Sequence, residues 1–280
     1  MGKIWSISTT VRNPDRIYNF LKVLSCLEGK VWNEDIQKIY QVLLIRFKLY
    51  KPKKYKNYIE NNEITNEKAI EIFEKCNYVD GPQRGRQSIN ILKKLKLVKI
   101  NNDNEIIITK LGKNFIDKKV TIGDLLPNLK LDSKSVFCDI SPFVATLEFL
   151  VRLDQKSKER TRGINNYEFK YYLMTTNDYS QISEYVDKLI EARQNKQVKL
   201  ENEEFVRNNY DNFKHAEDYF DSIYRYFKKS DLLIISFNNI KLNYNKIDDI
   251  LNIIKKYYKN IEKENEELEK LTSNSIINFR

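Results

Sequence analysis

Histidine is almost missing from this chain, because His215 is the only one among 280 residues. Zinc hydrolases and nucleases that use two or more histidines as metal ligands or proton carriers are therefore disfavoured. Cysteine is also sparse, and the three cysteines lie far apart, at Cys26, Cys76 and Cys138. This pattern matches neither a zinc site nor a disulfide framework, and it favours reduced thiols in a reducing compartment.

Long apolar runs are lacking as well. No stretch approaches the ~18 apolar residues that cross a membrane, and the first residues lack the apolar segment of a signal peptide. We therefore expect a cytoplasmic protein with no membrane partner. The seven glycines form no phosphate-binding loop, and no serine or cysteine has a base beside it in a nucleophile motif. The sequence predicts neither a small-molecule substrate nor a cofactor for this chain.

Basic charge is abundant and unevenly placed. Residues 1–134 carry 26 basic and 15 acidic side chains, whereas residues 135–280 carry 23 and 24. A composition rich in Lys, Asn, Ile and Tyr inflates the lysine count, but it does not explain this asymmetry. A basic half favours a polyanionic partner. Nucleic acid ranks above a membrane surface, because no basic amphipathic helix flanks an apolar anchor.

The spacing of apolar residues predicts a mainly α-helical fold with short β-hairpins. A chain of 280 residues, 41% of them hydrophobic, is long enough for two or three packed domains. The predicted segments are an N-terminal arm with helices at 1–60, a winged-helix subdomain at 61–134, a second helical or winged-helix subdomain at 135–255, and a linker helix or tail at 256–280. Within them, residues 127–135 are predicted as a linker and residues 163–176 as a helix.

The segment that starts at Thr65 has the element order of a winged helix. Thr65 is placed to cap a first helix. The predicted buried residues of that helix are Ala69, Ile70 and Phe73. A Gly-Pro turn leads to a second helix at 83–95, two apolar strands flank the hairpin sequence NNDN, and Thr109 caps a closing helix. Because a helix followed by a hairpin recurs at 212–244, we predict tandem winged-helix subdomains, in which the second helix enters the DNA major groove.

The predicted helix at 83–95 has an apolar stripe and a polar face. The stripe consists of Ile89, Leu92 and Leu95, with Ile91 at its edge. The polar face carries Gln83, Arg86, Gln87, Asn90 and either Lys93 or Lys94. An arginine binds guanine through two hydrogen bonds, and Asn or Gln binds adenine in the same way, at ~1–3 kcal/mol of discrimination each. Lysines are better suited to phosphates, because an ammonium is a point charge.

Further basic residues are candidates for phosphate contacts. Arg84 lies near the start of this helix, and Lys54 and Lys56 lie in the basic, aromatic segment at 51–58. For each of these residues, the alternative is an ordinary solvated surface. The candidate DNA-binding residues are therefore Gln83, Arg84, Arg86, Gln87, Asn90, Lys93, Lys94, Lys54 and Lys56.

A formal match to a Mg²⁺ nuclease motif occurs near the N-terminus. It consists of Asp15 after a proline, followed by Glu28 and Lys30. In such a site the Glu and the Lys alternate on a strand, so that both point at the metal. Here the spacer has helical periodicity, and Gly29 is typical of a helix end. We expect this match to be a decoy, and we assign no catalytic or metal-binding residue.

Four parts of the sequence carry a family resemblance through their order and spacing. They are WSISTTVRNPDRIYNFLKVLSCLEGKVW, GRQSINILKKLKLV with IIITKLGKNFI, TTNDYSQISEYVDKLIEAR, and AEDYFDSIYRYFKKSDLL. Together they resemble the N-terminal part of the AlwI family of type IIS restriction and nicking endonucleases, and the arrangement is similar to the recognition part of FokI-type enzymes. The resemblance implies a bacterial restriction enzyme that reads a short asymmetric site in double-stranded DNA through winged-helix subdomains. It also implies cleavage at a fixed distance by a separate C-terminal, Mg²⁺-dependent nuclease domain.

The chain ends at Arg280, where that family would continue into a linker and the nuclease. We therefore expect a DNA-recognition region that lacks the nuclease and has a nuclease domain or subunit as its second partner. Two alternatives stay open. One is a winged-helix transcription factor or replication initiator that binds a palindrome as a symmetric dimer. The other is a complete Mg²⁺-dependent endonuclease that uses Asp15, Glu28 and Lys30.

Overall fold

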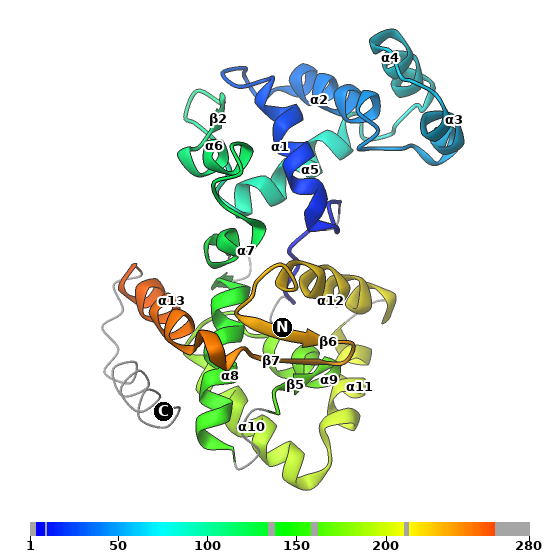
Figure 1. The fold of residues 1–280 in the computed structure, drawn as a ribbon. Coiled ribbons are helices and arrows are strands. Elements are labelled where there is room, and N and C mark those ends of the chain that lie inside the picture. The colour runs from blue at the N-terminus through cyan, green and yellow to red at the C-terminus, as the bar shows by residue number, and fades with distance from the viewer. Residues whose placement is uncertain (1–3, 9, 134–137, 158–161, 210–212, 261–280) are drawn as a thin grey trace. The chain divides into compact units, whose positions relative to one another are not determined.

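The computed structural model is mainly helical, with a few short strands in small sheets, as the sequence predicts (Figure 1). It describes residues 4–8, 10–133, 138–157, 162–209 and 213–260. The chain divides into two compact units: Ser8–Thr121 forms the first, and Met1–Ile7 together with Ile122–Arg280 forms the second. The first unit thus contains most of the predicted N-terminal segment together with most of the predicted winged-helix segment.

The first unit is built from helices and a short hairpin. Its elements are a 3-10 turn at Pro14–Arg16, α1 (Ile17–Ser25), α2 (Glu34–Arg46), a 3-10 turn at Lys53–Tyr55, α3 (Lys56–Asn61), α4 (Asn66–Lys75), α5 (Gln83–Lys94), β1 (Val98–Ile100), β2 (Ile106–Ile108) and α6 (Lys110–Ile116).

The core of the first unit forms where α2 meets α1, α4 and α5. Tyr40 and Leu44 of α2 are completely buried there. The predicted burial of Ile70 in α4 is wrong: this side chain is 44% exposed, and Ile72 is buried in its place. The reason is helical geometry, because positions 69, 72 and 73 share one face whereas position 70 is turned away from it. Ile91 of α5, predicted at the edge of the stripe, is fully buried.

The local signals for caps and the hairpin turn are confirmed. Strands β1 and β2 pair antiparallel, and Oδ1 of Asn101 closes their turn by accepting a hydrogen bond from the Glu105 amide at 2.7 Å. The Thr109 hydroxyl accepts from the amide of Gly112 at 3.0 Å and so caps α6. Thr65 caps α4 in the same way. Each of these contacts joins residues within four positions of each other, which explains why the sequence alone predicts them.

The second unit contains the longer helices. Its elements are α7 (Ile122–Leu125), β3 (Leu131–Ser133), β4 (Cys138–Ile140), α8 (Pro142–Lys156), β5 (Ile164–Asn165), α9 (Asn166–Glu168), a π-helix at Phe169–Leu173, α10 (Gln181–Asn195), α11 (Val198–Asn209), α12 (Phe213–Phe227), β6 (Leu233–Ser236), β7 (Asn239–Leu242) and α13 (Ile247–Asn260), with 3-10 turns at Leu126–Asn128 and Tyr244–Lys246.

Helix α8 is the centre of the second unit, and its residues 142–154 are all buried. The buried charges on α8 have partners. Glu148 accepts from Arg152 one turn away at 2.8 Å and from the Tyr258 hydroxyl of α13. Asp154 accepts from the hydroxyl of Tyr244. Because an unpaired buried charge would be strongly destabilising, these contacts fix α13 and the turn before it on α8.

Two predictions in the second unit need correction. Residues 163–176 are not one helix, because β5 pairs with β7 and only then do α9 and the π-helix begin. Asn165 sets that start, since its Oδ1 accepts from the amides of Tyr167 and Glu168. Part of the predicted linker at 127–135 forms strand β3, which pairs antiparallel with β4 after the linker, while residues 134–137 lie outside the described part. Strands of two or three residues leave no readable period in a sequence.

Three smaller expectations concern membranes, thiols and the tail. None of the helices among the described residues is both long and apolar enough to span a bilayer. Cys26 and Cys76 are free thiols, and the side chain of Cys138 lies outside the described residues. The predicted tail is helical up to Asn260, where α13 ends, and residues 261–280 lie outside the described part.

The packing of α6 on the hairpin makes Gly112 a sensitive position. A Cβ added there would stand 2.2 Å from the backbone oxygen of Leu97, so Gly112→Ala should lower the free energy of unfolding by about 1–3 kcal/mol. Urea denaturation measures this change. The matched control is Lys110→Ala on the exposed side of the same helix, which should stay within about 0.5 kcal/mol of the parent protein. Equal stability of both variants would contradict the close packing.

Candidate nucleic-acid interface

The first turn of helix α5 is held against α2. Gly85 lies so close to α2 that an added Cβ would stand 2.6 Å from the backbone oxygen of Gln37. The Gly85 amide donates a hydrogen bond to Oε1 of Gln41, at 3.1 Å, and the Gln41 side chain is completely buried. Ser88 and Leu92 continue the buried side of α5. This packing leaves the opposite side of α5 toward solvent.

The solvent side of α5 carries the candidate base readers. Arg84, Asn90 and Lys93 are exposed, whereas Gln83, Arg86, Gln87 and Lys94 are partly buried. The polar face predicted from helical spacing is therefore at least partly accessible along its length. This face presents guanidinium, amide and ammonium groups, and proteins use these groups to bind base edges and phosphates.

Two of the candidate readers already have partners within the protein. The Arg86 guanidinium forms an ion pair with the carboxylate of Asp80, in the turn before α5. Oε1 of Gln87 accepts hydrogen bonds from the hydroxyl of Thr10 at 3.1 Å and from Arg84 at 3.2 Å. Any acceptor outside the protein would therefore have to compete with Asp80 for Arg86. The period of α5 does not reveal the partners Asp80 and Thr10, because both lie outside the helix.

A pocket of about 430 Å³, which we call the basic pocket, lies beside α5. Its lining includes the basic residues Arg16, Lys48, Lys51 and Lys56, the hydroxyl residues Thr10 and Ser88, and also Phe20, Leu49, Tyr50 and Glu60. Of the two lysines predicted in segment 51–58, Lys56 thus lines the pocket, while the exposed Lys54 lies with its ammonium 5.6 Å from the centroid of the Tyr55 ring. The other basic residues of the pocket were missed because the fold gathers them from separate parts of the sequence.

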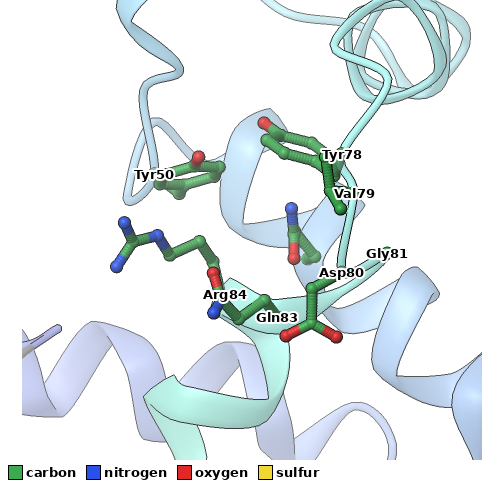
Figure 2. A pocket seen from close by; sticks show the side chains of 8 residues that line it. Tyr50, Tyr78, Val79, Asp80, Gly81, Gln83 and Arg84 are labelled. Carbon is green, nitrogen blue, oxygen red and sulfur yellow. The ribbon is translucent and has the colours of Figure 1, made fainter.

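A second pocket, of about 300 Å³, lies at the start of α5, and we call it the tyrosine pocket. Figure 2 shows Tyr50 and Tyr78 along one side of it and Asp80 and Gln83 along the other. Gln41, Val79, Gly81 and Arg84 complete the lining. The two tyrosine rings have centroids 6.4 Å apart and planes tilted by 42°. Both rings rest on the apolar core between α2 and α4, which limits their movement.

Two polar atoms of the tyrosine pocket are buried and lack a hydrogen-bond partner of ordinary geometry among the described residues. They are Nε2 of Gln41 and the hydroxyl of Tyr78. Burial raises the pKa of the Tyr78 hydroxyl well above its ordinary value, so this group stays protonated at neutral pH and keeps its ability to donate. A buried polar group without a partner costs about 1–3 kcal/mol. The pocket therefore offers hydrogen bonds to a molecule that enters it.

Comparison with known proteins places this geometry in a functional context. The family model described as AlwI restriction endonuclease matches residues 94–279. The chain belongs to the AlwI restriction endonuclease family. The resemblance seen in the sequence is thereby confirmed at the level of the family, and the partner that such a family implies is DNA. A search of curated proteins finds no match. The matched range begins at the last residue of α5, so it contains the β1–β2 hairpin but little of the α5 face.

The formal Mg²⁺ motif in the sequence consists of Asp15, Glu28 and Lys30, and the structure shows where these residues lie. Oε1 of Glu28 accepts a hydrogen bond from the Ile108 amide of β2 at 3.1 Å. Gly29 has a φ of 79° in the turn after α1, so Glu28 and Lys30 do not alternate on a strand, and Asp15 lies in the 3-10 turn before α1. Among the residues that the structure describes, no group of three or more His, Cys, Asp or Glu could hold a metal. We derive no metal-dependent step from these residues.

The contacts of Glu28 predict a role in the hairpin. Glu28→Ala should lower the free energy of unfolding by about 1 kcal/mol, because it removes the acceptor of the Ile108 amide and an ion pair with Lys113 at 3.4 Å. Chemical denaturation checks this, with Asp103→Ala in the exposed hairpin turn as the control. Unchanged stability, combined with loss of a Mg²⁺-dependent cleavage activity, would instead assign Glu28 to a metal site.

Proposed function

We propose that this chain is the sequence-specific recognition region of a type IIS restriction endonuclease, and that it reads a short asymmetric site in double-stranded DNA. In this proposal α4, α5 and the β1–β2 hairpin act as a winged helix, with α5 in the major groove and the hairpin beside it. Helix α12 and the β6–β7 hairpin form a second winged-helix subdomain.

The observation that carries this proposal is the polar face of α5. Its exposed residues, Arg84, Asn90 and Lys93, lie away from the side that is buried against α2. Helix α5 also follows α4 after a short turn and precedes a hairpin, which is the element order of a winged helix. Membership of a restriction endonuclease family supports DNA as the molecule that this face meets.

The side chains of α5 divide into base readers and phosphate contacts by their chemistry. Arg86 suits a guanine edge, and Asn90, Gln83 and Gln87 suit adenine. The phosphate contacts are then Arg84, Lys93 and Lys94 on α5, with Lys54 and Lys56 from the segment after α2.

The ion pair between Arg86 and Asp80 affects the free energy of base reading in this proposal. On DNA without guanine at the required position, Arg86 keeps its carboxylate partner and gains nothing from the base. On the correct site it exchanges one charged partner for a bidentate contact with guanine. Breaking the ion pair is thus a cost that only the correct site incurs, and the contact with guanine must exceed this cost to favour that site.

We further propose that cleavage is carried out by a separate Mg²⁺-dependent nuclease domain or subunit. The hydrogen bond between Glu28 and the hairpin supports this view, because it gives the one formal metal motif a structural role. Cleavage of the recognised duplex by the purified chain with Mg²⁺, abolished in Glu28→Ala, would instead indicate a complete endonuclease.

Selection from a random duplex pool tests the proposed function. The purified chain should enrich one short asymmetric sequence and bind it as a monomer, with an affinity that falls steeply as salt rises. Enrichment of a palindrome by a symmetric dimer would favour a transcription factor or replication initiator. Equal affinity for all duplexes would remove the claim of specificity.

Substitutions on α5 separate base readers from phosphate contacts. Arg86→Ala and Asn90→Ala should each relax the preference at one base pair, by about 1–3 kcal/mol, whereas Lys93→Ala should weaken binding to all sequences and reduce the salt slope by about 1. Fluorescence anisotropy on the selected site and its single-base variants measures both effects. Lys38→Ala, on the exposed side of α2, is the control and should change neither. Identical profiles for Arg86→Ala and Lys93→Ala would contradict the assignment.

A further inference from the structure

We propose that the tyrosine pocket binds one nucleobase rotated out of the DNA duplex, and that the basic pocket holds the phosphate of the same nucleotide. This inference rests on the proposed function, because it concerns a base of the bound DNA. It adds a second mode of sequence reading, by a base taken out of the helix, to the reading of paired bases by α5.

The position of the two pockets suggests a shared nucleotide. Both lie along α5: Gln83 lines the tyrosine pocket, and Ser88 lines the basic pocket. Tyr50 lines both of them. A nucleotide with its base on one side of Tyr50 and its phosphate on the other would therefore fill both pockets at once, beside the helix that we propose to lie in the major groove.

The rings of the tyrosine pocket suit a flat aromatic ligand. Tyr50 and Tyr78 are half-buried and supported from behind by the apolar core, so a base meets two rings that are already held in place. Stacking of a base on an aromatic side chain contributes about 1–3 kcal/mol. A volume of about 300 Å³ also lies at the small end of ligand pockets, as a single base requires.

The buried polar atoms suit the edge of a base. Oε1 of Gln41 is occupied by the amide of Gly85, and this bond fixes the amide group so that Nε2 remains to donate. The Tyr78 hydroxyl is a second buried group that forms no hydrogen bond of ordinary geometry among the described residues, although the side chains of Tyr50 and Cys76 lie near it. A base that presents acceptor atoms, such as the carbonyl oxygens of thymine, cytosine or guanine, satisfies both. Gln41 lines the pocket and is more deeply buried than the two rings.

Val79 supplies a group that could occupy the gap left in the duplex. It lies at the rim of the tyrosine pocket and is 106% exposed, so it has no packing role within the described part of its own unit. Proteins that unstack DNA insert apolar side chains between base steps. An apolar wedge next to an aromatic pocket is the combination that extrusion of a base requires, since the wedge replaces the stacking that the departing base loses.

The charge of the basic pocket suits the backbone of the displaced nucleotide. Its basic side chains outnumber its one carboxylate, Glu60, which pairs with Lys51 at 3.1 Å. Lys48 and Lys56 add positive charge, and the hydroxyl of Ser88 is a further polar group of the lining. Charge-assisted hydrogen bonds to a phosphate are among the stronger polar contacts available to a protein.

A mismatch scan of the selected duplex tests this proposal. A mismatch inside a recognition site ordinarily weakens binding. A mismatch at the base that leaves the duplex should instead raise the binding affinity by about threefold or more, because the protein no longer has to break a base pair. 2-Aminopurine placed at that position should also change its fluorescence when the protein binds, which reports the altered stacking directly.

Variants connect the effect to the pocket. Tyr50→Ala and Gln41→Met should each reduce the mismatch preference to below about twofold while leaving binding to the duplex measurable. Gln41→Met also removes the acceptor of the Gly85 amide and could therefore prevent folding. In that case Tyr50→Ala, which changes a half-buried ring, is the variant that tests the proposal. Val79→Ser should weaken the 2-aminopurine signal. Tyr58→Ala removes an exposed ring outside the pocket and should behave as the parent protein does.

The outcomes separate the two proposals. Specific binding with no position at which a mismatch strengthens it would overturn the pocket proposal and leave the recognition function standing. A mismatch preference that survives in Tyr50→Ala would also overturn it, because the base would then lie elsewhere. Absence of binding to every duplex would overturn both. A single mismatch-favoured position that is lost in Tyr50→Ala and kept in Tyr58→Ala would establish the pocket.

Discussion

The contact of α5 with α2 at Gly85 is the interaction on which the first unit depends. The missing side chain lets the two helix backbones approach, and the Gln41 amide oxygen satisfies the Gly85 amide inside the contact. This fixes the rotation of α5 about its own axis, which decides which side chains are buried and which meet solvent. The same bond leaves Nε2 of Gln41 facing the tyrosine pocket. One close approach between two helices thus sets both the polar face of α5 and the hydrogen-bonding chemistry of the pocket beside it.

The second unit is held together by a different kind of constraint. Helix α8 is buried along 142–154, and its charged residues are stable there only because Glu148 and Asp154 have partners on α13 and on the turn before it. The family match covers residues 94–279, which include most of this unit, and it begins at the end of α5. The match establishes the restriction endonuclease family of the chain. It covers almost none of α5, so the candidate base readers are inferred from the geometry of α5.

The predictability of each element follows the range of the interactions that define it. The caps at Thr65 and Thr109 and the turn closed by Asn101 join near neighbours, and the sequence predicted all of them. Burial on a helix face was less certain, because one position changes the direction of a side chain by about 100°, and Ile70 was placed on the wrong side. The β5 strand was not foreseen, since it is defined by pairing with β7 more than 70 residues away.

The sequence by itself determined the mainly helical fold, the helix caps and turns, the concentration of basic charge in the first half and the resemblance to the AlwI family. The sequence was also sufficient to predict the polar face of α5, because the helical period depends only on the spacing of residues within that segment. The tertiary structure alone decided that Asp80 holds Arg86, that Arg16, Lys48 and Lys56 share one pocket, and that Tyr50 and Tyr78 enclose another. The residues of the two pockets come from separate elements that only the tertiary packing brings together, and Asp80 is six residues from Arg86 but lies in the turn before α5, outside its helical period.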